Sequence, residues 1–352
     1  MKNTLLITPP FTQLNTPYPA TAYIKGFLNT KSISAFQMDL GIEVILELFS
    51  KAGLQQIFNS VQESELITEN LQRIYSLKDD YINTIEAVIA FLQGNNPTLA
   101  RQVCSGNFLP EAFRFNQLDD MEWAFGTMGM QDKAKHLATL YLEDLSDFVV
   151  ECIDENFGFS RYAERLGRSA NSFDELYAEL QNETTYIDKI TLKILEEKIK
   201  VVQPKLVLIS VPFPGNLYSA FRCAQFIKTN FPEIKISMGG GFPNTELRSL
   251  KDTRVFEFFD FITLDDGELP VELLYSKIQN PNSDEFKRTF LLENNEVVYK
   301  NNTTKHDYKQ SDVGTPDYSD LLLDKYISVI EIANPMHSLW SDGRWNKLTM
   351  AH

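Results

Sequence analysis

The sequence is poor in cysteine, in positive charge and in long apolar runs. Only three of its 352 residues are cysteines, and Cys104, Cys152 and Cys223 lie too far apart for a zinc-binding or iron–sulfur-binding loop. An odd, sparse set also argues against the disulfide framework of a secreted protein, so we interpret all three as buried thiols. No stretch reaches the ~18 apolar residues of a membrane span, and the N-terminal apolar run is too short for a signal peptide. The sequence therefore predicts a cytoplasmic protein.

Positive charge is outweighed by negative charge. Lysine and arginine together number 33 against 48 aspartates and glutamates, which gives a formal net charge of -15. A chain of this sign is repelled by a phosphate backbone and by an anionic lipid surface. We therefore expect no nucleic-acid partner and no membrane partner. Hydrophobic residues make up 43% of the chain, enough for a buried core, which excludes an intrinsically disordered protein.

Short apolar runs that alternate with helical patterns predict an α/β protein with a parallel sheet. The expected strands cover residues 4–8, 33–40, 206–211, 234–238 and 259–264. Residues 63–182 carry helical periodicity alone, and connections between strands of one sheet are normally short. We therefore expect this region to be a helical insertion with its own core.

Four segments follow from this pattern. Residues 1–62 and 183–280 are expected to form the two halves of one α/β domain, separated by the insertion at 63–182. Residues 281–352 are expected to form a hairpin outside the parallel sheet, followed by a linker, because Asn294-Asn295 is a turn signal between two apolar runs.

Ligands of open parallel sheets bind beyond the carboxyl ends of the strands. The loops at these ends contain Thr8-Pro9-Pro10, Ser210 and three consecutive glycines, Gly239-Gly240-Gly241. Glycines lack a Cβ and let a bulky ligand come close to the backbone, although an ordinary turn explains such a cluster about as often. Neither the G-x-G-x-x-G dinucleotide fingerprint nor a P-loop is present.

Taken together, these loops resemble the N-terminal cobalamin-binding domain of cobalamin-dependent radical SAM proteins. The resemblance is carried by Leu5-Leu6-Ile7-Thr8-Pro9-Pro10, Leu208-Ile209-Ser210-Val211, Met238-Gly239-Gly240-Gly241 and Asp266-Gly267-Glu268, and it covers about residues 1–62 and 184–280. It implies a flavodoxin-like fold with five parallel strands in the order 2-1-3-4-5 and a groove for the corrinoid and its nucleotide tail. The cofactor-binding residues that it implies are Thr8, Pro9, Pro10, Ser210, Gly239, Gly240 and Gly241.

Two departures from the family bear on cofactors. Classical cobalamin modules carry D-x-H-x-x-G, whose histidine ligates cobalt, and none of the four histidines here lies in such a motif. The C-x-x-x-C-x-x-C motif that holds the family's [4Fe-4S] cluster is also missing. The resemblance therefore implies a chain that ends just before the radical SAM domain, with the cluster and S-adenosylmethionine bound only in that missing C-terminal domain.

The resemblance thus implies the cobalamin-binding portion of a radical SAM enzyme that performs methyl transfer, cyclisation or related radical chemistry. Its partners would be the small-molecule cofactor and its own radical SAM domain, and this chain alone would not be an enzyme. The alternative is a non-catalytic Rossmann-like binding or regulatory module that has lost the corrinoid. The missing axial histidine favours the alternative, and the glycine cluster opposes it.

Overall fold

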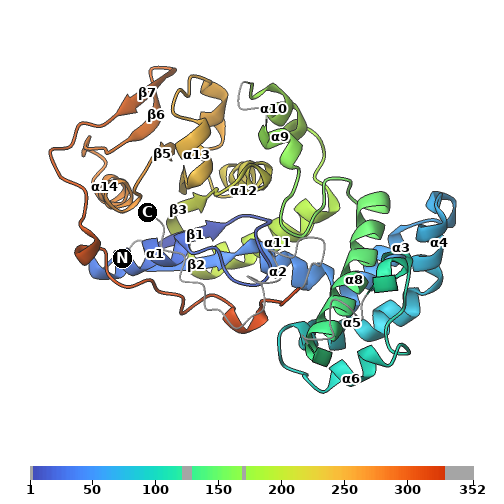
Figure 1. Ribbon diagram of the computed structural model, residues 1–352. Coiled ribbons are helices and arrows are strands. Elements are labelled where there is room, and N and C mark those ends of the chain that lie inside the picture. Colours follow the sequence, from blue (N-terminus) through green and yellow to red (C-terminus); the bar gives the residue numbers. More distant parts are fainter. Residues whose placement is uncertain (1–2, 121–128, 169–171, 330–352) are drawn as a thin grey trace. The chain divides into compact units, whose positions relative to one another are not determined.

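The computed structural model of the protein describes residues 3–120, 129–168 and 172–329 and divides the chain into two compact units (Figure 1). The sheet unit comprises residues 1–12, 18–41 and 160–321, and the helical unit comprises residues 13–17, 42–159 and 322–352. The helical unit thus differs from the insertion expected at 63–182. Its boundary lies at 159 because helices α9 (Glu164–Arg168) and α10 (Asp174–Gln181) pack against α12 (Leu217–Asn230) of the sheet unit.

The sheet unit is built on one mixed sheet of seven strands in the order β2-β1-β3-β4-β5-β6-β7. The first five strands in this order pair in parallel, and β6 and β7 pair antiparallel. The strands are β1 (Asn3–Thr8), β2 (Ala35–Asp39), β3 (Pro204–Ser210), β4 (Lys235–Gly239), β5 (Phe261–Thr263), β6 (Thr289–Glu293) and β7 (Glu296–Lys300).

The hairpin after residue 280 corrects the expectation of a purely parallel, five-stranded sheet. The sequence placed this hairpin outside the sheet, but Ile262 of β5 pairs with Phe290 of β6. The amide of Leu264 also donates to the carbonyl of Arg288 (3.0 Å). The physical reason is that β5 would otherwise expose a row of unpaired backbone groups, which β6 covers. Periodicity identifies strands but does not show which edge a later strand joins.

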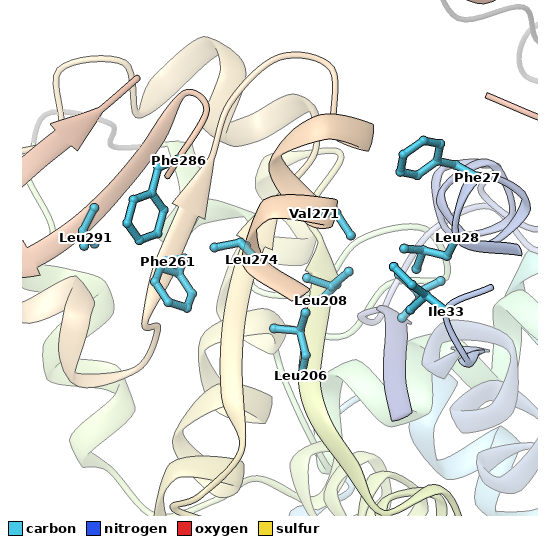
Figure 2. Close-up of a cluster of buried hydrophobic side chains, with 11 residues drawn as sticks. Phe27, Leu28, Ile33, Leu206, Leu208, Phe261, Val271, Leu274, Phe286 and Leu291 are labelled. Atoms are coloured by element: carbon cyan, nitrogen blue, oxygen red, sulfur yellow. The ribbon is translucent and has the colours of Figure 1, made fainter. Parts of the chain in front are cut away.

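Helices cover both faces of the sheet. On one face α1 (Ala20–Thr30) and α14 (Glu268–Gln279) pack on a cluster of buried side chains (Figure 2). The cluster consists of Leu6, Phe27, Leu28, Ile33, Leu206, Leu208, Phe261, Val271, Leu274, Phe286 and Leu291. On the other face α11 (Tyr186–Val202) packs against α12 and contacts β1. Apolar residues point to both faces, which explains the uninterrupted apolar runs of the central strands.

The strap, which we define as residues 314–320, covers the outer edge of β2. The carboxylate of Asp320 accepts from the amide of Gln37 (2.9 Å), and the Gln37 side chain donates to the carbonyl of Asp317 (2.6 Å). Lys25 of α1 forms ion pairs with Asp320 (2.5 Å) and Asp317 (3.5 Å). A Cβ at Gly26 would overlap the carbonyl oxygen of Thr315, so this helix glycine is what lets the strap lie directly on α1.

The helical unit has its own core. Its α-helices among the described residues are α2 (Leu40–Leu48, whose first two residues belong to the sheet unit), α3 (Lys51–Ser60), α4 (Glu69–Ser76), α5 (Lys78–Leu92), α6 (Leu99–Cys104) and α8 (Gly129–Cys152). The described residues within 63–182 contain no strand, as the periodicity indicates. Asp144 lies buried in this core and accepts from the amides of Ala112 and Arg114 (both 3.0 Å) and from the hydroxyl of Tyr81 (3.3 Å). Burial raises the pKa of Asp144 to about 6.

Across the described ranges, no helix combines the length and the apolarity that crossing a membrane requires.

Candidate functional site

The carboxyl ends of the five parallel strands form one row of small or polar residues. Thr8 pairs with Asp39, and Ser210 pairs with Gly239, at the last position of each strand. The pairing of Ile7 with Ile209 brings Thr8 beside Ser210. On the far side of Gly239, β5 ends with Thr263. The register therefore brings together three of the seven cofactor-binding residues expected from the sequence.

These residues belong to the face of the sheet that α1 and α14 cover. Side chains alternate along a strand, so Thr8 shares a face with Leu6, and Ser210 shares a face with Leu208. Leu6 and Leu208 belong to the cluster under α1 and α14. The candidate site thus lies where the interface between the sheet and helices α1 and α14 reaches the carboxyl ends of the strands.

Several buried polar atoms on this face have no hydrogen-bond partner among the described residues. Ser210 Oγ is one of them, and Ser237 Oγ lies one pleat deeper, beside Leu208. Thr21 Oγ1, in the first turn of α1, is a third. Thr4 Oγ1 and Gln37 Oε1 occupy strand positions of the same face. A buried polar group without a partner costs about 1–3 kcal/mol, so water or a ligand would supply partners to Ser210 Oγ and Ser237 Oγ. Thr4 lies near the start of β1 and is not part of the row.

Ser237 is the residue that the sequence interpretation missed. In the run Ile234 to Met238 it shares the strand phase of the exposed Lys235, so alternation predicts a polar side chain that faces solvent. It is 2% exposed. The burial of Ser237 comes from the helices that cover this face, so no signal in the sequence could have identified it.

The loop between β1 and α1 contains four prolines, and we call it the proline loop. Asn216 holds its first residues in place. The Asn216 side-chain amide donates to the carbonyls of Pro9 (3.0 Å) and Phe11 (2.8 Å). Both Pro9 and Pro10 are buried. Both prolines therefore lie inside the protein and do not face solvent.

Two of the three consecutive glycines are required by the chain itself. Gly240 has φ +108°, and a Cβ there would lie 2.7 Å from the carbonyl oxygen of Val211. A Cβ on Gly241 would lie 2.7 Å from the carbonyl oxygen of Pro212. The loops after β3 and β4 thus touch backbone to backbone, and the amide of Val211 donates to the carbonyl of Gly239 (2.8 Å). These contacts explain Gly240 and Gly241 without a ligand.

Gly239 is in a different situation. Its φ lies outside the left-handed region, and a Cβ would approach only Thr263, at 3.0 Å from Oγ1. No backbone atom lies within 3.5 Å of that Cβ position, so no backbone contact requires a glycine here. The absent side chain at Gly239 therefore leaves space next to Ser210 that the packing of the loops does not demand.

An aromatic pair lies in the loops above this row. The ring of Phe213, in the loop after β3, meets that of Tyr18, in the proline loop, edge to face at 5.7 Å. Phe213 is 51% exposed. Burial raises the pKa of the Tyr18 hydroxyl, so Tyr18 stays neutral at physiological pH. The pair supplies apolar surface beside a polar row.

Of the acidic residues after β5, Asp265 is held by an ion pair, whereas Asp266 is held through its backbone carbonyl. Asp265 pairs with Arg248, and the carbonyl of Asp266 accepts from Arg288 (2.9 Å). Glu268 opens α14, where an acidic residue is favourable, and burial raises its pKa. No three cysteine, histidine, aspartate or glutamate side chains of the described chain are grouped as a metal site requires.

No histidine or cysteine of the described ranges contributes to the row. His136 is buried in α8 of the helical unit, and His306 lies in the loop after β7. His337 and His352 lie outside the described residues. Cys104 and Cys152 end α6 and α8, and Cys223 lies in α12. All three are free thiols, but only Cys223 is buried, whereas Cys104 and Cys152 are half-buried, which corrects the expectation of three buried thiols.

A cavity of about 640 Å³ lies elsewhere in the sheet unit. Its walls come from α10, α12, α13 (Gly241–Glu246) and the short helix η4 (Thr253–Glu257), with Phe173, Phe221 and Phe242 among them. Arg254 at its rim is neutralised by Asp174 (2.7 Å) and Asp252 (2.6 Å). Of the seven expected residues, none lines this cavity.

Comparison of the chain with protein-family models, with curated proteins and with solved structures gave no match.

Proposed function

We propose that the chain binds a cobalamin at the carboxyl ends of β1, β3 and β4 and forms the cobalamin-binding portion of a radical SAM enzyme. The observation that supports this proposal most directly is the buried Ser210 Oγ, which has no hydrogen-bond partner among the described residues and lies between Thr8 and Gly239. This is the serine that the loop resemblance assigns to the cofactor. The order of the parallel strands, 2-1-3-4-5, agrees with the flavodoxin-like fold of the proposal.

The residues present fit such a cofactor in part. Ser210 Oγ and Ser237 Oγ would donate to or accept from polar groups of the nucleotide tail. Gly239 would leave room for the tail next to Thr263, and Thr8 with the buried Pro9 and Pro10 would shape the opposite wall. Gly240 and Gly241 would fix the loop that carries Gly239. When bound, the cofactor would supply a cobalt-bound methyl group or one-electron chemistry, while the protein would bind and orient it.

The two covering helices approach each other closely where α14 begins. A Cβ on Gly267, before α14, would lie 3.0 Å from Ile24 Cδ1 of α1. Thr8 and Ser237 are almost fully buried under these helices. Binding of a cofactor there would therefore require the covering side chains to move aside.

The proposal is tested by titrating the protein with hydroxocobalamin and following visible absorbance. We expect one cofactor per chain. Gly239→Leu fills the space beside Thr263 and should weaken binding roughly tenfold or more. Ser210→Ala removes one hydrogen-bonding group and should weaken it by roughly threefold to tenfold. Ser219→Ala, at a buried serine of α12, is the control and should bind like the unaltered protein.

Each variant needs a thermal melt, so that loss of binding is separated from loss of fold. A substitution at Gly240 does not serve here, because it disturbs the backbone contact with Val211 whatever the ligand. Absence of uptake by the unaltered protein, under both reducing and non-reducing conditions, would overturn the proposal.

The alternative function is a non-catalytic Rossmann-like binding or regulatory module that has lost the corrinoid. Two observations favour it: Gly240 and Gly241 are explained by protein contacts alone, and no described histidine lies at the carboxyl ends of the strands. Under either function we expect the protein in the cytoplasm, because its three thiols are unpaired.

A further inference from the structure

The sheet has two outer edges, and only one of them is covered by the described chain. The strap covers the edge at β2 through Asp317 and Asp320. At the other edge β7 is the outermost strand (Figure 1). β7 contains no proline, and its ladder with β6 runs without a bulge from Lys300 to Glu296. Natural sheets generally protect such an edge, so an open, regular one suggests a partner strand.

The turn of the hairpin defines which backbone groups point outward. Asn294 (φ +50°) and Asn295 (φ +63°) form a two-residue turn of the type I′ kind. Such a turn is closed by a hydrogen-bonded pair, here Glu293 with Glu296, and the bonding alternates from there. Val297 and Tyr299 therefore direct their N–H and C=O groups away from β6. Outside this hairpin, no hydrogen bond of the described chain uses those groups.

The sequence of β7 is complementary to itself when it is read antiparallel. With Val298 on a twofold axis, Glu296 lies opposite the partner's Lys300, and Val297 lies opposite the partner's Tyr299. This register pairs the two outward-pointing residues with each other, which allows four hydrogen bonds between the strands. We infer that β7 pairs antiparallel with β7 of a second copy of this chain and joins the two sheets into one.

The charges on one face of the hairpin favour this partner. Glu293 and Glu296 are directly opposed in the hairpin, a repulsive pair. Lys300 offsets the negative charge of Glu293 through an ion pair (2.6 Å), and it forms a second ion pair with Asp284 (2.8 Å). Glu296 has no ion pair within the described residues. The partner's Lys300 would bring positive charge to Glu296.

The other face of the hairpin is apolar and open to solvent. Tyr299 is 46% exposed and Leu292 is 38% exposed, and the Tyr299 ring lies 4.9 Å from that of Phe290. In the twofold pairing, each Val297 would pack against the partner's Tyr299 and extend this apolar strip across the interface. Aromatic and β-branched residues are favourable cross-strand neighbours.

The interface is small, because each copy contributes one strand of five residues. We therefore expect a weak dimer with a dissociation constant in the micromolar range, which sedimentation velocity from about 1 µM to about 1 mM would detect. This inference does not depend on cobalamin, and the measurement needs none.

Two substitutions, Val297→Pro and Glu296→Lys, test the pairing, and Val297→Thr is the control for the first of them. Val297→Pro removes an N–H that points outward, which an edge strand tolerates, and should raise the dissociation constant roughly tenfold or more. Val297→Thr keeps that N–H and the shape of the side chain, and should stay within about threefold. Glu296→Lys places like charges opposite each other and should also weaken the dimer. Thermal melts of the variants confirm that the fold is retained.

Two outcomes would overturn the inference. One is a monomer over the whole concentration range. The other is a dimer whose dissociation constant is unchanged by both Val297→Pro and Glu296→Lys, because its interface would then lie elsewhere on the chain.

Discussion

Gly240 shows how a sequence signal for a ligand can be a signal for packing. Its φ of +108° with ψ of -172° lies in a region that essentially only glycine occupies. Three backbone atoms of Val211, its carbonyl oxygen, amide nitrogen and carbonyl carbon, also lie within 3 Å of where a Cβ would be. The glycine is needed so that the loops after β3 and β4 can touch.

A pair of glycine substitutions separates backbone strain from this steric overlap. Gly240→Ala should lower the free energy of unfolding by roughly 3 kcal/mol or more, since strain and overlap both act. Gly94→Ala, at φ +81° with no atom within 4 Å of its Cβ position, should cost only about 1 kcal/mol. Urea denaturation measures both values. Equal costs at the two positions would show that the contact with Val211 is not tight.

At the scale of elements, a buried ion pair joins three helices of the sheet unit. Arg222 of α12 contacts Asp188 of α11 (3.1 Å), and their side chains are 4% and 3% exposed. Arg222 also donates to the carbonyl of Leu180 at the end of α10 (3.0 Å) and to the hydroxyl of Tyr218 (2.8 Å). Asp188 in addition forms the capping box of α11 with Thr185. One guanidinium thus fixes where α10 ends and α11 begins.

Removal of this guanidinium leaves a buried carboxylate without its charge partner. Arg222→Met should therefore lower the free energy of unfolding by roughly 3–5 kcal/mol, and adding Asp188→Asn should recover part of the loss. Lys228→Met on the same helix is the matched control. Lys228 pairs with Asp260 (2.6 Å) but is 23% exposed, and Asp260 keeps Lys235 as a second partner, so its loss should cost at most about 1 kcal/mol. Equal costs for the two methionine variants would contradict the proposed role of Arg222.

At the scale of the whole molecule, the thiols are spread over both units. Cys104 and Cys152 belong to the helical unit, and Cys223 belongs to the sheet unit. Burial raises the pKa of Cys223 and raises that of Cys152 to about 11, so both remain protonated at neutral pH. Thiolates are what hold an iron–sulfur cluster, and three of them must converge.

We therefore expect this chain, reconstituted anaerobically with iron and sulfide, to bind no stoichiometric cluster and not to cleave S-adenosylmethionine. In the proposed enzyme a separate radical SAM domain would supply both. Iron and sulfide analysis and visible absorbance measure the outcome. A signal that survives replacement of all three cysteines by serine would be adventitious iron, whereas one abolished by a single replacement would show that the chain has a cluster site.

The sequence by itself determined the features that depend on neighbouring residues. The apolar runs ending at Thr8, Ser210 and Gly239 predict strands that end together, and the register brings these three residues into one row. Helical periodicity likewise predicts the helical character of the long stretch between β2 and β3. Short-range patterns suffice here because both features repeat with the period of the local backbone.

Only the tertiary structure decided what lies against each residue. It showed that Gly240 is required by Val211, that Ser237 is a buried hydroxyl without a described partner, and that β6 joins the sheet beside β5. It also placed the strap on one sheet edge and left β7 at the other. The physical reason is that such contacts join residues far apart in the chain, and periodicity carries no information about which distant backbone they meet.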